Sequence, residues 1–402
     1  MNTADSLALL RRGADQIVPE GELERKLQAG RPLRVKYGID PTGIDVHLGH
    51  TVPLRKLRQF QQLGHQAVLI IGNYTALVGD PSGRDQTRAR LTVEQVEANA
   101  KDYLQQVGRI IDLDRAEVHH NGDWFGRYRF LDVLSLTSKM TVQRMTERDD
   151  FTKRLKAGTP IYLHECLYPL MQGHDSVEVR ADVELGGSEQ LFSLLVGRNL
   201  QAEAGQEPQV CLTLPILRGL DGQRRMGKSL GNYIGVAEPA YDQFAKTMSI
   251  PDELLREWFE LLTDRSVAEI ARLTDPGQIH PMEAKKRLAM DIVEFYHGGP
   301  AAESARAEWE RRFSQRQDPT EIADCIVPSA ELADGAIWVC KAMQLAGLAP
   351  STSGARRLIQ GGGVTLGTDR AKVNDPKLNL AIPAEGVILR VGQRKVVRLR
   401  PG

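Results

Sequence analysis

Residues 40–50 read Asp40-Pro-Thr-Gly-Ile-Asp-Val-His47-Leu-Gly49-His50, and the interpretation of the whole chain starts from them. A strand-like run precedes this stretch, and apolar residues at helical spacing follow it. A turn between a strand and a helix offers an anion the backbone N–H groups and the positive end of the helix dipole. Gly49 lets a flat ligand approach the backbone, and the two histidines can donate to phosphate oxygens. The stretch therefore predicts a nucleotide site, although alone it also fits a plain turn with two surface histidines.

Strand and helix patterns alternate around this stretch. The expected order is strand 33–39, helix 50–63, strand 67–71, helix 92–111, strand 117–120, helix 162–173, strand 179–183, helix 186–199 and strand 210–214. The helix at 92 begins with a capping box of Thr92 and Gln95. Residues 124–160 interrupt the order with a mostly helical insertion. This pattern predicts an α/β fold with a Rossmann-like parallel sheet that binds nucleotide at the carboxyl ends of its strands.

The flanking segments contain mainly helical patterns and a basic C-terminal part. Two short helices interrupted at Pro19 are expected in residues 6–30, helices in 241–315, and a polar linker in 315–330. No strand is expected between 214 and about 336. Residues 336–402 carry eleven Lys or Arg against three Asp or Glu, a net charge of +8 in a chain whose total is zero. A basic module of this kind predicts contact with a polyanion.

The bulk composition is that of an ordinary globular protein. The 402 residues are 41% hydrophobic and 26% charged, which is enough for two or three domains. Four widely spaced cysteines without a C-x-x-C pair favour reduced thiols and a cytoplasmic location over a disulfide or zinc scaffold. The N-terminus has no signal-peptide pattern, and no apolar run suggests a membrane span.

Tyr168, Gln172 and Asp175 are spaced so that one face of a helix presents all three side chains. A phenol, an amide and a carboxylate that point together could hold a polar aromatic amino acid, with the carboxylate accepting a phenolic O–H. By spacing alone, a solvated helix face is the more common explanation.

A second candidate site is the polar loop after strand 210–214, Arg225-Met-Gly-Lys228-Ser229. Its positive charge suits a mobile loop that closes on phosphates. Its ordinary alternative is a basic surface loop.

These motifs together resemble the tyrosyl-tRNA synthetase family of class I aminoacyl-tRNA synthetases. His47-x-Gly49-His50, with the upstream Asp-Pro-Thr, is similar to the first class I signature, and 225–229 is similar to the second, KMSKS. Tyr168-x-x-x-Gln172-x-x-Asp175, the run Gly-Gly-Ser-Glu-Gln at 186–190 and the run at 79–84 resemble the pocket of tyrosyl enzymes. His280-Pro-Met-Glu-Ala resembles the anticodon-proximal helical domain, and Gly-Ala-Arg356-Arg357 resembles an S4-type RNA-binding module.

The resemblance implies three domains. They are a Rossmann-like catalytic domain at 1–232 with its helical insertion at about 124–160, an α-helical anticodon-proximal domain with linker at 233–330, and an S4-like RNA-binding domain at 336–402. The last is a small α+β module in which Arg356 and Arg357 bind RNA.

The resemblance also implies a role for each matching residue in the amino-acid pocket. Tyr168, Gln172 and Asp80 bind the tyrosine ammonium, Asp175 binds its hydroxyl, and Gln190 lies near its carboxyl. Position 36 is Lys where one branch of the family has a Tyr on the substrate hydroxyl, and whether Lys36 or its neighbour Tyr37 makes that contact stays open.

For ATP, the resemblance implies binding by Asp40, Gly49, Gly187, Glu189 and Lys228. Seven residues are expected to stabilise the negative charge that builds on the reacting phosphates: His47, His50, Arg225, Lys228, Ser229, Arg84 and Arg88. The sequence departs from the family pattern at Arg225, usually Lys, and at Glu189, usually Asp, so the ribose contact of Glu189 is the less secure assignment.

The predicted activity is tyrosine–tRNA ligation. Tyrosine is activated with ATP and Mg²⁺ to tyrosyl-adenylate and then transferred to the 3′ end of tRNA(Tyr), with no side-chain nucleophile. No protein ligands are predicted for the metal, and the resemblance implies a homodimer formed through 124–160. Two alternatives remain. One is a tryptophan-specific relative, against which Asp175 argues, and the other is an RNA-binding paralogue without aminoacylation activity.

Overall fold

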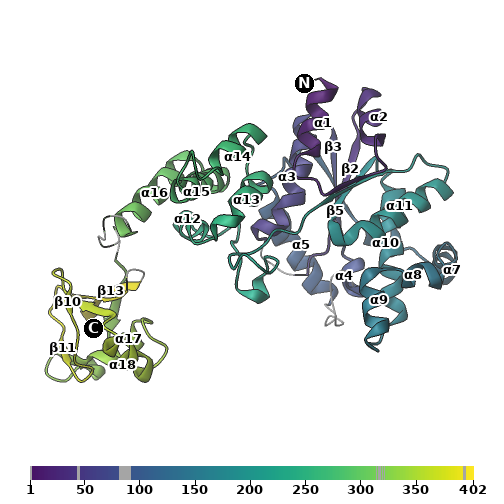
Figure 1. The fold of residues 1–402 in the computed structure, drawn as a ribbon. Coiled ribbons are helices and arrows are strands. Elements are labelled where there is room, and N and C mark those ends of the chain that lie inside the picture. Colours follow the sequence, from purple (N-terminus) through teal and green to yellow (C-terminus); the bar gives the residue numbers. More distant parts are fainter. Residues whose placement is uncertain are drawn as a thin grey trace. The chain divides into compact units, whose positions relative to one another are not determined.

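A computed structural model of the chain describes residues 2–42, 46–80, 92–313, 315, 318, 320, 322–392 and 395–402 (Figure 1). These residues form two compact units, 1–299 and 300–402. The boundary lies at the first turn of helix α16 (Gly299–Phe313). The division into three domains at 232 and 336 stays a prediction.

In the part of the chain that the structure describes, the first unit is built on a six-stranded sheet in the order β1-β6-β5-β2-β3-β4. Its strands are β1 (Gln16–Val18), β2 (Arg34–Ile39), β3 (Gln66–Ile71), β4 (Ala116–His120), β5 (Val183–Gly187) and β6 (Val210–Leu214). Strands β2 to β6 run parallel, and β1 pairs antiparallel with β6. The chain leaves β2 toward β3 and later returns on its other side at β5. Ligands of open α/β sheets bind at this switch point.

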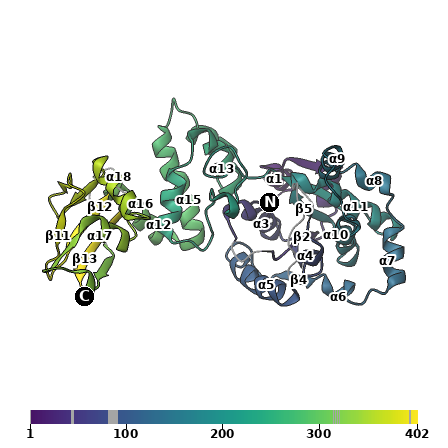
Figure 2. The same cartoon turned by 90° about the horizontal axis from the view of Figure 1, so that it is seen from below.

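Apolar strands explain why helices cover both faces of the sheet. All residues of β6 and nearly all of β3 are buried, as expected for central parallel strands. Helices α3 (Leu48–Gln62) and α5 (Val93–Val107) lie on one face, and α10 (Tyr168–Glu178) and α11 (Leu191–Glu203) lie on the other (Figures 1 and 2). The predicted capping box is present, with Thr92 Oγ1 accepting from Gln95 N at 3.3 Å.

The rest of the first unit is helical. Short helices near the N-terminus and around the carboxyl ends of the parallel strands are α1 (Thr3–Arg11), α2 (Glu22–Gln28), α4 (Thr75–Val78), η2 (Ser188–Gln190) and η3 (Lys228–Leu230). The predicted insertion at about 124–160 is helical, with α6 (Gly122–Phe125), α7 (Phe130–Thr137), α8 (Val142–Thr146) and α9 (Asp149–Lys156). The predicted helix 162–173 is instead η1 (Leu163–Leu167) followed by α10. After the sheet come α12 (Ala240–Met248), η4 (Asp252–Leu254), α13 (Leu255–Leu262), α14 (Val267–Leu273) and α15 (Pro281–His297).

The second unit contains its own core and two small sheets. Its described strands form a sheet in the order β10-β9-β12-β13-β7 and a pair β11-β8. Their bounds are β7 (Asp324–Val327), β8 (Ala336–Trp338), β9 (Val364–Leu366), β10 (Ala371–Lys372), β11 (Asn379–Ala381), β12 (Val387–Val391) and β13 (Lys395–Pro401). The remaining elements are η5 (Ser329–Glu331), α17 (Val339–Leu345) and α18 (Thr352–Gln360). This β-rich unit fits the predicted S4-like module.

Three expectations about strands are wrong. Residues 6–30 contain β1 between two helices, because β6 leaves an edge on which these three residues pair. Strand 179–183 is displaced, since β5 begins at Val183. The supposed linker 315–330 contains β7, which pairs with β13 and buries Val327 in the core of the second unit. Across the described ranges, no helix is both long and apolar enough to cross a membrane.

Candidate active site

The two signature segments, far apart in sequence, lie against each other. Val236 N donates to Val46 O and Leu48 N donates to Ile234 O, both at 2.9 Å, so the first signature pairs with the chain just after the second. Met226 of the second signature is buried and packs at Gly49, where an added Cβ would lie 3.5 Å from the Met226 Cβ. The structure therefore assembles one site from both motifs.

His47 and His50 form a stacked pair at the start of α3, with ring centroids 3.7 Å apart. His47 is buried, and burial together with the nearby His50 lowers its pKa to about 3. His47 Nδ1 is buried and has no hydrogen-bond partner among the described residues. A neutral imidazole with an unused nitrogen at a helix N-terminus can bind an oxyanion without carrying charge of its own.

Helix α10 turns its predicted polar face inward, not to solvent. Tyr168, Gln172 and Asp175 are 6%, 9% and 3% exposed. Tyr168 donates its hydroxyl to Asp40 Oδ2 at 2.8 Å, which joins α10 to the end of β2. Burial, followed by the charges of Asp40 and Asp80, raises the pKa of the Tyr168 phenol well above its ordinary value. The concentration of carboxylates there suits a cation such as an ammonium group.

A chain of hydrogen bonds connects Asp40 to Asp175 across the sheet edge. Thr75 Oγ1 donates to Asp40 Oδ1 at 2.7 Å, and Asn121 Nδ2 donates to Thr75 Oγ1 at 3.0 Å. Gly72 ends β3 at this point, where an added Cβ would lie 2.1 Å from Asp40 Oδ1. The carboxylate of Asp40 thus occupies the space that any larger residue at 72 would need.

Asp175 is a buried carboxyl whose two oxygens both accept from neighbours. Trp124 Nε1 donates to Oδ1 at 3.0 Å and Asn121 Nδ2 donates to Oδ2 at 3.4 Å. Burial raises the pKa of Asp175 to about 7, against the lowering effects of Lys36 and these two donors. The two donors use only part of the lone pairs of this carboxyl, so Asp175 can also accept from a substrate hydroxyl.

The side chain of Lys36 is fully buried and contacts helix α10. Its ammonium donates to Gln172 O at 2.7 Å, Ser176 Oγ at 2.8 Å and Glu184 Oε1 at 2.9 Å. An ammonium has three N–H donors, so none remains for the direct substrate contact predicted for Lys36. Its neighbour Tyr37 points to the opposite face of β2, where it packs against the main core.

Residues after β5 and in the second signature loop complete the site with accessible groups. Gly187 N donates to Gln190 Oε1 at 3.2 Å, and Glu189 is exposed beside them. Arg225, Lys228 and Ser229 are exposed in the loop. Two further predicted residues, Arg84 and Arg88, lie outside the described residues. Arg356 and Arg357 are exposed on α18 of the second unit.

Sequence reasoning missed four residues that shape the pocket: Gly72, Thr75, Asn121 and Trp124. Two of them follow strand ends directly, since β3 ends at Ile71 and β4 at His120. The rule that ligands bind outside the carboxyl ends of parallel strands would have selected Gly72 and Asn121. Trp124 carries no such signal, because its contact with Asp175 depends on how the insertion folds back.

A family model described as tRNA synthetases class I (W and Y) matches residues 28–314. The chain belongs to this family. Its curated relatives include proteins named tyrosine–tRNA ligase from Symbiobacterium thermophilum, 50% identical over 99% of this chain and 98% of that protein, and Aquifex aeolicus, 46% identical over the full length of both. A third, from Moorella thermoacetica, is 47% identical over 98% of this chain and 96% of its own.

Solved structures of tyrosyl-tRNA synthetases have the same fold. The enzyme from Archaeoglobus fulgidus, complexed with L-tyrosine, superposes with a TM-score of 0.63, is 25% identical, and the match covers 76% of this chain and all of that one. A C-terminally truncated mitochondrial enzyme from Aspergillus nidulans gives a TM-score of 0.64 at 20% identity, over 77% of this chain and 94% of that chain. At that identity the second likeness concerns the fold alone.

Proposed function

We propose that this chain is a tyrosine–tRNA ligase that makes tyrosyl-adenylate from tyrosine and ATP and transfers the tyrosyl group to tRNA(Tyr). The observation that carries the proposal is the buried carboxyl of Asp175 on the same helix face as Tyr168 and Gln172. The names of the curated relatives support the same activity. Because these relatives are named for tyrosine, the tryptophan alternative is disfavoured.

Tyrosine binds with its ring along α10 in this proposal. Asp175 accepts the phenolic O–H, while Tyr168, Gln172 and Asp80 surround the ammonium. Gln172 Oε1 supports this arrangement, because it is buried and has no hydrogen-bond partner among the described residues. Gln190 lies near the carboxyl. The direct hydroxyl contact from Tyr37 or Lys36 is left out, since their side chains are used elsewhere in the fold.

ATP binds between the two signatures. Gly49 and Gly187 leave room for the nucleotide, Glu189 accepts from the ribose, and Asp40 lies beside the α-phosphate. The tyrosine carboxylate attacks the α-phosphorus, and pyrophosphate leaves. Catalysis of this step depends on positioning and on donors aimed at the developing charge. We assign those donors to His47, His50, Arg225, Lys228 and Ser229, with Arg84 and Arg88 assisting.

Mg²⁺ accompanies ATP in this scheme and neutralises phosphate charge. Among the described residues, no group of three His, Cys, Asp or Glu side chains could hold a metal ion. The scheme assigns the ion to the phosphate oxygens of ATP.

The tRNA is held partly by the second unit, where Arg356 and Arg357 are exposed and the sequence 336–402 has a net charge of +8.

The enzyme acts as a homodimer through its helical insertion. Large apolar side chains are exposed there, with Phe130 75%, Leu131 76% and Val142 81% exposed, and patches of this kind mark protein interfaces. All four cysteines lie within the described ranges and are free, in accord with the reducing cytoplasm.

The test is transfer of labelled tyrosine to tRNA. The purified chain, ATP, Mg²⁺ and bacterial tRNA are expected to give acid-precipitable tyrosyl-tRNA, and labelled tryptophan should give none. An RNA-binding paralogue would bind the same tRNA yet leave it uncharged. Charging with tryptophan in place of tyrosine would reassign the substrate.

A further inference from the structure

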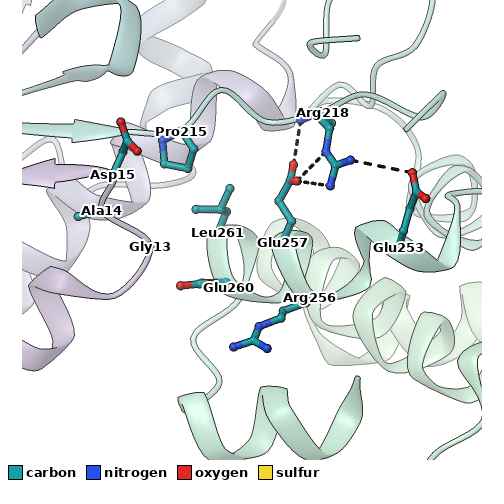
Figure 3. Close-up of a pocket in the computed structure, with 10 residues that line it drawn as sticks. All are labelled: Gly13, Ala14, Asp15, Pro215, Arg218, Glu253, Arg256, Glu257, Glu260 and Leu261. Carbon is teal, nitrogen blue, oxygen red and sulfur yellow. Dashed lines mark hydrogen bonds and ion pairs between the residues drawn. The ribbon is translucent and has the colours of Figure 1, made fainter. Parts of the chain in front are cut away.

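The second signature loop is fixed to helix α13 through one arginine. Arg218 lies between β6 and the loop, and Glu257 of α13 holds it by a two-pronged contact. Arg218 N donates to Glu257 Oε1 at 3.0 Å, and Arg218 Nε and Nη2 reach Glu257 Oε2 at 2.8 and 2.7 Å (Figure 3). Backbone and side chain of the same residue are thereby bound to one carboxylate.

The neighbouring contacts extend this attachment into the loop. Trp258 Nε1 donates to Arg218 O at 3.2 Å, and Arg218 Nη1 donates to Gly222 O at 3.2 Å. Arg218 also forms an isolated β-bridge with Arg225, the first residue of the signature, and Met226 N donates to Leu217 O at 2.9 Å. The position of Arg218 thus determines where the signature residues begin.

Polar contacts hold the Arg218 guanidinium, whose Nε and Nη2 both reach Glu257 Oε2. The side chain is 38% exposed and borders a cavity of about 410 Å³ whose lining also includes Glu253, Glu257 and Glu260 (Figure 3). The backbone contact of Arg218 N to Glu257 Oε1 supports the pair, and charge-assisted hydrogen bonds are stronger than neutral ones. Loss of the Glu257 charge should therefore loosen the guanidinium.

We infer that Glu257 and Arg218 are positioning residues for adenylate formation, which act by holding the loop that carries Lys228 in its reactive place. The inference rests on the proposed function, because it needs Lys228 to act on the phosphates. Neither residue touches substrate. Misplacing a catalytic group by about 1 Å costs up to roughly 100-fold in rate, so a loosened anchor should lower kcat rather than weaken tyrosine binding.

A matched ion pair provides the control. Arg265 and Asp291 of α15 form an ion pair of similar exposure, with Nε to Oδ2 at 2.5 Å and Nη2 to Oδ1 at 2.8 Å. The side chains are 30% and 18% exposed, against 38% and 23% for Arg218 and Glu257. Glu257→Gln and Asp291→Asn therefore remove equivalent charges, one at the loop and one away from it.

The experiment measures tyrosine-dependent exchange of labelled pyrophosphate into ATP by the full chain. We expect Glu257→Gln to lower kcat by about 10- to 100-fold with the tyrosine KM changed by less than about twofold, while Asp291→Asn leaves kcat near wild type. In a Lys228→Ala background the added loss should disappear, since residues that act as a unit are not additive.

Two results would overturn the inference: equal kcat for Glu257→Gln and Asp291→Asn, or a loss of the same size with and without Lys228. Absence of exchange by the wild-type chain would instead reject the proposed function. Should Glu257→Gln fail to fold, Arg218→Lys is the second variant. It keeps the charge but loses the two-pronged contact and the reach to Gly222, and the same non-additivity with Lys228→Ala is expected.

Discussion

The amino-acid pocket and the second signature loop are held in opposite ways. On α10, Tyr168 and Asp175 are nearly fully buried and each is hydrogen-bonded within the protein. In the loop, Arg225 and Lys228 are exposed. The order of the loop comes from its base, where Asn232 is 4% exposed and binds Gly227 N, Arg225 O and Asp221.

This difference indicates how the two substrates are handled. A rigid, preformed pocket can reject an amino acid that leaves its polar groups unpaired. A loop with exposed charged side chains can close on a polyphosphate and open again to release the product. Variants in the pocket should therefore change selectivity, and variants in the loop should change rate.

The largest expected effect belongs to the loop. Lys228→Ala should lower kcat of the exchange reaction by about 100- to 1,000-fold with a small change in the ATP KM, because its ammonium acts on charge that develops in the transition state. Steady-state exchange kinetics at varied ATP give both constants. A variant with normal kcat and a raised KM would show that the loop only binds ground-state ATP.

The pocket variant should act on selectivity. Asp175→Ala removes the buried carboxyl that accepts from the substrate hydroxyl. The ratio of kcat/KM for tyrosine over phenylalanine should therefore fall by about 10- to 100-fold. The ratio is measured in the same exchange assay, with Asp291→Asn as a control of unchanged ratio. If Asp175→Ala left the ratio at its wild-type value, Asp175 would have no contact with the substrate hydroxyl.

The buried state of Asp175 predicts a pH effect on stability. Its pKa is about 7 in the folded chain and near 4 when unfolded, so between these values the folded state holds a proton that the unfolded state has lost. This residue's contribution to the free energy of unfolding should fall by up to about 1.4 kcal/mol per pH unit as pH rises across that window. Asp175→Asn removes the contribution. Urea unfolding of both chains from pH 4 to 8 tests it, and parallel curves would contradict the assignment.

The smallest effect on activation is expected from removing the second unit. Pocket and loop both lie before residue 233, so a chain ending at Phe313, which leaves out β7 and the sheet it joins, should exchange pyrophosphate within about twofold of the full chain. It should charge tRNA poorly, and its tRNA affinity should depend less steeply on salt, because fewer phosphates are neutralised. If the tRNA affinity and its salt dependence were unchanged, the basic module would only aid solubility and would not bind tRNA.

The local patterns of the sequence were enough to predict the central sheet and the common face of three candidate residues. Strand 210–214 was predicted to the residue, and the spacing of Tyr168, Gln172 and Asp175 gave the correct common face, because apolar periodicity and helical geometry are local properties. Strands β1 and β7 were missed, since segments of three or four residues become strands only through the partner strand that covers them.

Contacts between segments that are distant in the sequence could not be predicted from local patterns. Whether Lys36 or Tyr37 contacts the substrate hydroxyl was left open from the sequence. In the structure the three donors of Lys36 are directed to α10 and β5, which no pattern within β2 reveals. Asn121 and Trp124 reach Asp175 only once the insertion has folded against α10. Tertiary structure decided the role of each of these residues.

The central claim is that α10 selects tyrosine and the two signatures activate it. The most direct measurement is pyrophosphate exchange by the wild-type chain with tyrosine, phenylalanine and tryptophan supplied separately. We predict rapid exchange with tyrosine and far slower exchange with the other two. Equal or faster exchange with tryptophan, or no exchange with any of the three, would contradict the account.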